Sequence, residues 1–197
     1  MEKSKSSNRI VTICFLGLMA ALCMVSNYLQ IRLPIGGDAG TRIHFANAFC
    51  LLAGYLFGGV GGGLAAGIGA SIFDLTDPVF APEFYITFVF KFAMAFLCGL
   101  IAWSGGAQGR RFWRNVAAGV TGSLVYVALY LAKTYVVKFF IEKNDPATVW
   151  TVMLPKAATS LGNAAIAVVI AVPLAAALRR AFDSMNFDRY LTFGSRK

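Results

Sequence analysis

Polar side chains recur at helical spacing within three long apolar stretches of the sequence. Thr87 and Lys91 stand four residues apart in the first stretch. Residues three, four or seven apart share one face of a helix, so such a pair lies on a single stripe. The same periodicity links polar side chains of two later stretches, which are Ser123, Tyr126, Tyr130 and Lys133 in one, and Lys156, Thr159, Ser160 and Asn163 in the other.

These side chains suit the recognition of a small molecule that carries a flat ring and electronegative groups. Tyrosine rings stack on a flat ring, and their hydroxyls hydrogen-bond to its edge. Lysine ammonium groups favour a carboxylate, a phosphate or a carbonyl-rich partner. Apolar walls with a few placed polar groups are typical of small-molecule pockets. The predicted substrate-binding residues are Thr87, Lys91, Tyr126, Tyr130, Lys133, Lys156, Thr159 and Asn163.

Each of these residues also has a simpler explanation. A lysine near a membrane surface can snorkel to it, and tyrosines gather in the interfacial belt. The carboxylates of Asp74, Asp77 and Glu83 could also neutralise the lysines. Three lysines at similar depth, each with polar neighbours on its own helix face, favour a shared water-accessible cavity.

The elements that carry the stripes are predicted to cross a membrane. Of the 197 residues, 58% are hydrophobic and 14% are charged, whereas soluble domains contain about 25% charged residues. A spanning helix needs about 20 apolar residues. We expect an all-α membrane protein with one domain (residues 1–197) and six transmembrane helices, at about residues 10–31, 44–58, 60–76, 83–104, 112–140 and 148–178.

The net charge of +9 follows membrane topology. Most lysines and arginines fall at the two termini and in the loop 104–114, which the positive-inside rule places in the cytoplasm. We therefore expect both termini to be cytoplasmic and no nucleic-acid partner. The first outer loop (residues 32–43) is long and rich in Gly and Pro, and the second (residues 74–83) carries three carboxylates and two prolines. The inner connections are a tight turn and a basic loop, so the ligand is expected to arrive from outside.

Other classes of protein have less support. The four cysteines form no C-x-x-C pair and there is one histidine, so no metal site is expected. Lys156 and Ser160 lie four residues apart, but nothing else indicates a catalytic dyad, which leaves a membrane-embedded enzyme as a weak alternative. A self-sufficient secondary transporter is a further alternative, although no inverted repeat is visible. A purely structural protein would leave the intramembrane lysines unexplained.

The glycine-rich segment FGGVGGGLAAGIGAS (residues 57–71) satisfies a loose dinucleotide-binding pattern. No strand precedes it, and the acidic residue of a βαβ unit is missing, so a phosphate cradle is not predicted. Its small residues instead predict a tight turn at residues 57–60 and a helix that neighbours approach closely. The small stripe is formed by Gly59, Gly63, Gly67 and Ser71.

The chain resembles the substrate-binding S component of an energy-coupling factor (ECF) transporter. The resemblance covers nearly the whole chain and rests on the six spans and four segments. The most specific is LFGGVGGGLAAGIGASIFDL, and the others are GLMAAL, LPIGGDAGTRIHFANAF and AVPLAAALRR. In GLMAAL, Gly17 and Ala21 stand where the family often has an A-x-x-x-A pair, so Gly17 is a departure from the pattern.

This resemblance implies a non-enzymatic subunit in a prokaryotic cell membrane that captures a water-soluble vitamin from outside. It would deliver the vitamin by docking, through Gly17 and Ala21, to a transmembrane coupling subunit with two ATPase subunits. The chain has no Walker motif and needs no cofactor, so these partners would hydrolyse ATP. Riboflavin-like, pyrimidine, pyridoxine, folate-like, pantothenate and queuine-type ligands all remain open. The resemblance implies a gating loop that includes Gly36, Gly37, Arg42 and Asn47.

Overall fold

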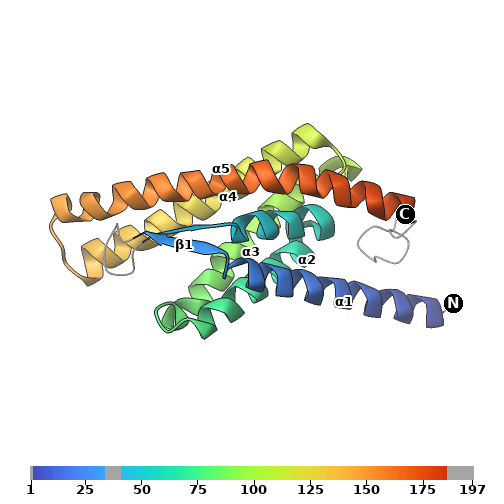
Figure 1. Cartoon of the computed structure of the whole chain (residues 1–197), viewed down its shortest axis with the longest axis horizontal. Coiled ribbons are helices and arrows are strands. Elements are labelled where there is room, and N and C mark those ends of the chain that lie inside the picture. The colour runs from blue at the N-terminus through green and yellow to red at the C-terminus, as the bar shows by residue number, and fades with distance from the viewer. Residues whose placement is uncertain (1, 34–40, 186–197) are drawn as a thin grey trace.

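Residues 2–33 and 41–185 are described by the structure, which is a computed structural model. Long helices account for most of these residues: α1 (Glu2–Ser26), α2 (Ala46–Thr76), α3 (Phe84–Trp103), α4 (Phe112–Tyr135) and α5 (Pro146–Ser184) (Figure 1). Shorter elements join them, namely the strands β1 (Gln30–Leu33) and β2 (Thr41–His44), the 3-10 turns η1 (Ala81–Glu83) and η2 (Ser104–Gly106), and the π-helical segment η3 (Val136–Ile141).

The protein is mostly helical, as expected, but it also contains two strands that the prediction did not include. β1 and β2 pair as an antiparallel ribbon with Gln30 opposite His44. The first predicted span ran to residue 31, whereas α1 ends at Ser26. The Ser26 hydroxyl and the Asn27 amide both donate to the carbonyl of Cys23, at 2.9 and 2.7 Å. Such side-chain bonds compete with helix continuation. The second predicted span began at residue 44, which is the last residue of β2.

Gly58 divides α2 into two arms, residues 46–57 and 59–76. Its φ of 74° lies in the left-handed region that favours glycine. A Cβ atom on Gly62 would come within 2.5 Å of the Gly54 Cα atom, although eight residues of a straight helix span about 12 Å. The two arms therefore run antiparallel. The predicted turn at residues 57–60 is confirmed.

The second arm of α2 packs its small stripe against aromatic rings of α3. A Cβ atom would lie 2.9 Å from the Phe92 ring at Gly63, and 3.0 Å from the Phe88 ring at Gly67. Phe88 and Phe92 stack with ring centroids 6.1 Å apart, and Phe96 extends the stack at 5.5 Å. The absence of side chains on the stripe lets the rings rest on the backbone, as the sequence predicted.

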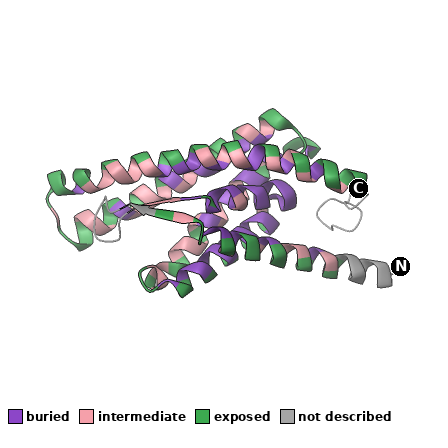
Figure 2. Cartoon of the chain, in the orientation of Figure 1, coloured by how far each residue is buried: buried purple, intermediate pink, exposed green. Residues whose placement is uncertain are grey.

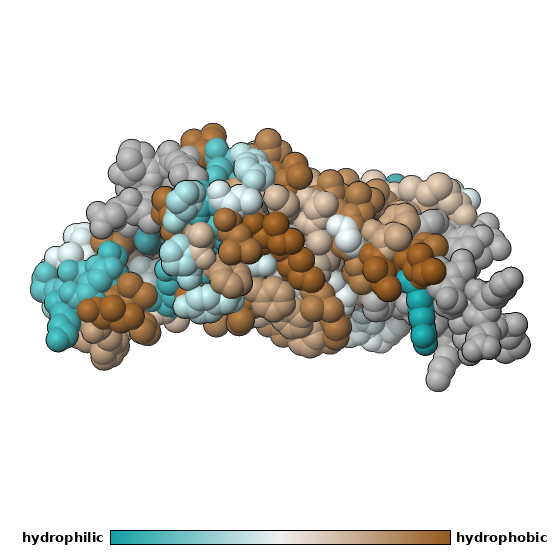
Figure 3. Space-filling view, turned by 90° about the horizontal axis from the view of Figure 1, so that it is seen from below, coloured by the Kyte–Doolittle hydropathy of each residue, from teal (hydrophilic) through white to brown (hydrophobic). Residues whose placement is uncertain are grey.

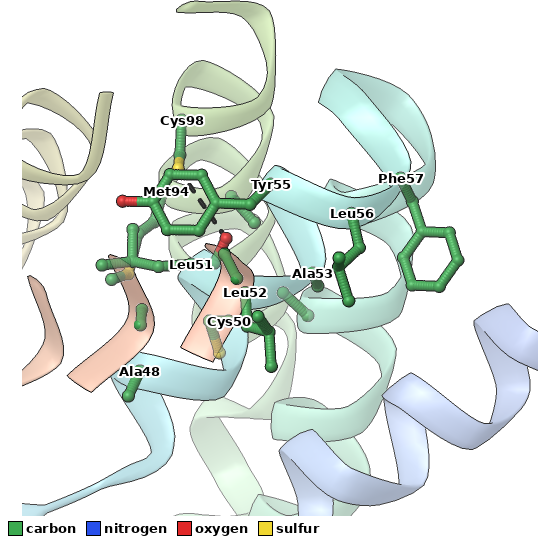
Figure 4. Close-up of a cluster of buried hydrophobic side chains, with 14 of the residues drawn as sticks. Ala48, Cys50, Leu51, Leu52, Ala53, Tyr55, Leu56, Phe57, Met94 and Cys98 are labelled. Atoms are coloured by element: carbon green, nitrogen blue, oxygen red, sulfur yellow. Dashed lines mark hydrogen bonds between the residues drawn. The ribbon is translucent and has the colours of Figure 1, made fainter. Parts of the chain in front are cut away.

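The first arm of α2 forms the centre of the core. Figure 2 shows α2 as the most continuously buried helix, flanked by elements with exposed outer faces. Figure 4 shows its apolar side chains meeting Met94 and Cys98 of α3. The Tyr55 ring is fully buried, and its hydroxyl donates to the Asn115 carbonyl at 2.7 Å. The buried Tyr55 hydroxyl is thus paired with a backbone carbonyl, which avoids the cost of an unsatisfied polar group.

A buried arginine caps the end of this arm next to Gly58. The Arg179 guanidinium, from α5, donates to the carbonyls of Tyr55 at 2.9 Å and Leu56 at 2.8 Å. The Trp103 indole also donates to the Tyr55 carbonyl, at 2.9 Å. The last carbonyls of a helix have no partner within the helix, so these donors stabilise the break in α2 and join it to α3 and α5.

The helices fit a membrane in length and composition. Within the described residues, five of them are long and apolar enough to cross one, over Arg9–Ser26, Ala46–Thr76, Ala81–Gly106, Phe112–Ile141 and Pro146–Ser184. Figure 3 shows hydrophobic side chains over the middle of one face, with hydrophilic ones gathered toward the end that lies away from the start of α1. The first residues of α1 and the last of α5 lie at the same end of the molecule (Figure 1).

We predict that Gly69→Ala destabilises the protein. A Cβ atom on Gly69 would press on the Ala20 carbonyl of α1 and lie 2.8 Å from the Cys23 Cβ atom. Such overpacking costs about 1–3 kcal/mol, which lowers the midpoint of thermal unfolding in detergent. The matched control is Gly162→Ala in α5, where a Cβ atom has nothing within 4 Å. Equal melting of both variants would contradict this account of the α1–α2 contact.

Candidate functional site

Lys91 joins three helices at the centre of the candidate site. It projects from α3, and 3% of it is exposed. Its ammonium donates to the Asn47 amide oxygen at the start of α2, and lies 4.1 Å from the Tyr126 ring centroid on α4. An amide oxygen and an aromatic face are both neutral, so the positive charge of Lys91 is solvated without being cancelled by either. A charge held in this way can attract an electronegative ligand group.

Tyr126 and Tyr130 form a stack that continues from Lys91. Their ring centroids are 6.4 Å apart and their planes differ by 9°. The ammonium of Lys156, on α5, lies 6.0 Å from the Tyr130 ring centroid. The result is a row of two parallel rings with a lysine at each end, which we call the Lys–Tyr row. The structure thereby brings together four of the predicted binding residues, from three separate polar stripes.

Asn163 connects α5 to the β-ribbon. Its side-chain oxygen accepts a bond from the His44 backbone N–H at 3.2 Å, and its side-chain nitrogen donates to the Arg42 carbonyl at 2.7 Å. These two backbone groups point from the same edge of β2, so the Asn163 amide completes that edge as a neighbouring strand would. Asn163, which was predicted to bind substrate, here fastens the ribbon over the helices.

Arg42 fastens the ribbon on another side. Its guanidinium carbon lies 3.6 Å from the Phe80 ring centroid, and it donates to the Gln30 side-chain oxygen at 3.3 Å. Phe80 lies in the loop between α2 and η1. Reasoning from the sequence did not single it out, since nothing distinguishes it from the other phenylalanines. Of the expected gate residues, Arg42 contacts Phe80 and Gln30, and Asn47 accepts a hydrogen bond from Lys91. Gly36 and Gly37 lie outside the described residues.

Three predicted binding residues have other neighbours. The Lys133 ammonium forms an ion pair with Glu83 of η1 at 2.5 Å, which is the neutralising role considered for that carboxylate. The Thr159 hydroxyl donates to the Pro155 carbonyl of its own helix at 2.9 Å. Thr87 lies beside the carboxylate of Asp74. These three contacts leave the Lys–Tyr row as the most concentrated part of the predicted site.

His44 is buried next to the Lys–Tyr row. Burial lowers its pKa well below the usual value, with further contributions from the charges of Lys91 and Arg42. The imidazole is therefore neutral at physiological pH. Its Nδ1 atom has no hydrogen-bond partner within the described part of the chain. In the sequence, only the fact that the chain has one histidine could have drawn attention to this residue.

A separate groove opens beside β1. Its volume is about 440 Å³. It lies between the end of α1 and the end of α2, where the Tyr28 hydroxyl and Thr76 hydroxyl are 2.9 Å apart. Its lining shares no residue with the Lys–Tyr row, and consists of Tyr28, Gln30, Phe73, Thr76, Asp77, Pro78 and Val79.

We predict that Asn163→Leu loosens the β-ribbon. The leucine removes both bonds to β2, so the His44 backbone N–H is expected to exchange with deuterium at least about tenfold faster, which corresponds to the loss of about 1.4 kcal/mol of local protection. Hydrogen exchange followed by mass spectrometry of the peptide that contains β2 measures this. Thr159→Val is the control, since that hydroxyl bonds within its own helix. Unchanged exchange in Asn163→Leu would show that other contacts hold the ribbon.

Comparisons with known proteins agree with the membrane fold and with the resemblance found in the sequence. A family model described as "ECF-type riboflavin transporter, S component" matches residues 7–180. No curated protein and no solved structure matches the chain.

Proposed function

Because the chain belongs to the family of ECF-type riboflavin transporter S components, we propose that it captures a riboflavin-like vitamin from outside the cell. An S component is the substrate-binding subunit of a vitamin transporter and is not an enzyme. The chain is accordingly a multi-pass membrane protein that serves vitamin uptake. The identity of the vitamin and the residues that hold it are what we propose here.

The observation that carries this proposal is the Lys–Tyr row beneath the β-ribbon. An isoalloxazine is a flat ring system with carbonyl groups on one edge. Two parallel tyrosine rings offer faces for stacking, and an ammonium at each end offers donors to carbonyl oxygens. The proposed contacts are Lys91, Tyr126, Tyr130 and Lys156, with Asn163 and Asn47 at the boundary of the ribbon. Thr87, Lys133 and Thr159 complete the proposed site at its edges.

The proposed topology has six crossings of a prokaryotic cell membrane. The two arms of α2 count as separate crossings, because they run antiparallel from the break at Gly58. An even number of crossings agrees with the start of α1 and the end of α5 lying at one end of the molecule (Figure 1). We propose that this end is cytoplasmic, which the basic residues of the two termini and of the loop 104–114 support through the positive-inside rule. The β-ribbon then covers the outer end, where the vitamin arrives.

The exposed face of α1 is the proposed contact with a transmembrane coupling subunit. Gly17 and Ala21 are both exposed, and a Cβ atom on Gly17 would meet no described atom within 4 Å. Leu18 and Leu22 are exposed on the same helix. Small residues in such a setting let a partner helix approach closely. We propose that two ATPase subunits bound to that partner hydrolyse ATP, and that this chain carries no cofactor.

We predict that Lys91→Ala and Asn163→Ala each weaken riboflavin binding at least about tenfold, because each removes a donor from a buried site. Quenching of riboflavin fluorescence, measured on the purified subunit without ATP, gives the dissociation constants. Lys143→Gln is the control, since Lys143 is exposed in the loop before α5. Wild-type affinity in both alanine variants would refute the site, while tight binding of pantothenate or a pyrimidine in place of riboflavin would refute the ligand.

We predict that Gly17→Leu and Ala21→Leu leave riboflavin binding unchanged and abolish uptake into cells. Bulky side chains at these positions face outward, so they obstruct a partner without disturbing the fold. Uptake of labelled riboflavin into cells that contain the coupling and ATPase subunits is compared with binding by the purified subunit. Loss of binding in these variants would instead mean that the pair packs within the subunit.

A further inference from the structure

Asp74 is a buried carboxylate that the proposed site does not yet use. It lies near the end of the second arm of α2, and 2% of it is exposed. Thr87 lies beside it, and it interacts electrostatically with Arg42 and Lys91. One of its carboxylate oxygens, Oδ2, has no hydrogen-bond partner among the described residues. Asp74 therefore faces the same group of residues as the proposed vitamin site.

The two cationic side chains near Asp74 make their hydrogen bonds and ring contacts with other residues. Lys91 donates to Asn47 and lies over Tyr126, while Arg42 stacks on Phe80 and donates to Gln30. A buried carboxylate oxygen without a hydrogen bond is destabilising, because it has lost its hydrogen bonds to water and no protein donor replaces them. A hydrogen-bond donor supplied by a ligand would satisfy this oxygen.

His44, which also interacts electrostatically with Lys91, has the same property. Its Nδ1 atom is buried and unpaired within the described residues, and Asn163 fixes its backbone. The neighbourhood of Lys91 thus contains two unsatisfied polar atoms from different elements, β2 and α2. Both belong to the part of the protein where the vitamin is proposed to bind, so the ligand is expected to bring polar groups of its own.

We propose that Asp74 Oδ2 accepts a hydrogen bond from an N–H or O–H group of the vitamin. This inference rests on the proposed function and deepens it. Lys91 can only donate hydrogen bonds, and a carboxylate can only accept them. Lys91 and Asp74 together therefore select a ligand that has both a carbonyl group and a hydrogen-bond donor. In riboflavin the donor is either the imide N3–H, which lies between two carbonyls, or a hydroxyl of the ribityl chain. Asp74 is then a specificity-determining residue.

The test is Asp74→Asn, which keeps the shape of the side chain and replaces one acceptor oxygen with a donor nitrogen. We expect this variant to bind riboflavin at least about tenfold more weakly. Three ligands identify the donor: riboflavin, N3-methylriboflavin, which lacks the imide N–H, and lumiflavin, which lacks the ribityl hydroxyls. The penalty of the substitution should vanish for the analogue that lacks the donor read by Asp74, and persist for the other.

Two controls separate recognition from folding. Asp77→Asn removes the same charge three residues later, where Asp77 Oδ1 accepts the Val79 backbone N–H within the loop, and it should bind riboflavin within about twofold of the unaltered protein. The ligand-free Asp74→Asn protein should melt at the same or a higher temperature, because a buried carboxylate with one unbonded oxygen has been replaced by a neutral amide. A purely structural role for Asp74 predicts a lower melting temperature and an equal loss of affinity for all three flavins.

The outcomes are distinct. Unchanged riboflavin affinity in Asp74→Asn, or an equal loss for all three flavins, overturns the role of Asp74 and leaves the proposed function intact. Failure of the unaltered protein to bind any flavin overturns the proposed function and the Asp74 assignment with it. A penalty that disappears with one analogue, together with undiminished thermal stability, supports the inference.

Discussion

The fold depends on direct backbone contact between the two arms of α2. At Gly62 a single added carbon would be too close to Gly54 and Ala53 of the opposite arm, so the hairpin can close only because this position is glycine. At Gly54 an added carbon would instead press on the Ala95 carbonyl, so this glycine lets α3 pack against the hairpin. This closure has a consequence for the site. The first arm begins near Asn47 and the second ends near Asp74. Antiparallel arms therefore deliver these two polar residues, far apart in sequence, to the same end of the molecule beside Lys91 and Thr87.

The polar groups of the site are largely occupied by one another. Lys91 bonds to Asn47, and Asn163 bonds to the edge of β2. In a medium of low dielectric constant such internal pairing avoids the cost of leaving a polar group unsatisfied. A ligand that bound in the proposed site would exchange these bonds for its own, so its affinity would be the difference between two well-bonded states. The unpaired atoms of Asp74 and His44 would favour the exchange, because there a ligand would gain a bond without breaking one.

Much of the site could be predicted from the sequence, because helical periodicity determines which side chains share a face. It predicted the stripe positions of Lys91, Tyr126, Tyr130 and Lys156, which the structure places in one row. Periodicity does not determine which partner a long side chain chooses, and Lys133 bonds to Glu83 instead. The β-ribbon was also missed. Its strands are four residues each, too short for a clear alternating pattern, and the bonds from Asn163 that hold β2 come from a helix more than a hundred residues later.

Besides its packing against α2 and α4, helix α5 makes hydrogen bonds to backbone groups of other elements at two distant positions. Asn163 holds the outer ribbon, and Arg179 holds the carbonyls of Tyr55 and Leu56 beside the break in α2. Sixteen residues separate these attachments, which is about 24 Å along a helix. A single helix therefore bonds to both the outer ribbon and the inner turn of α2. Pro173 lies between the two attachments and lacks the N–H that would close the helical bond there. Because a helical hydrogen bond is missing at this proline, α5 bends more easily there than an uninterrupted helix would, at a point between the two ends that it holds.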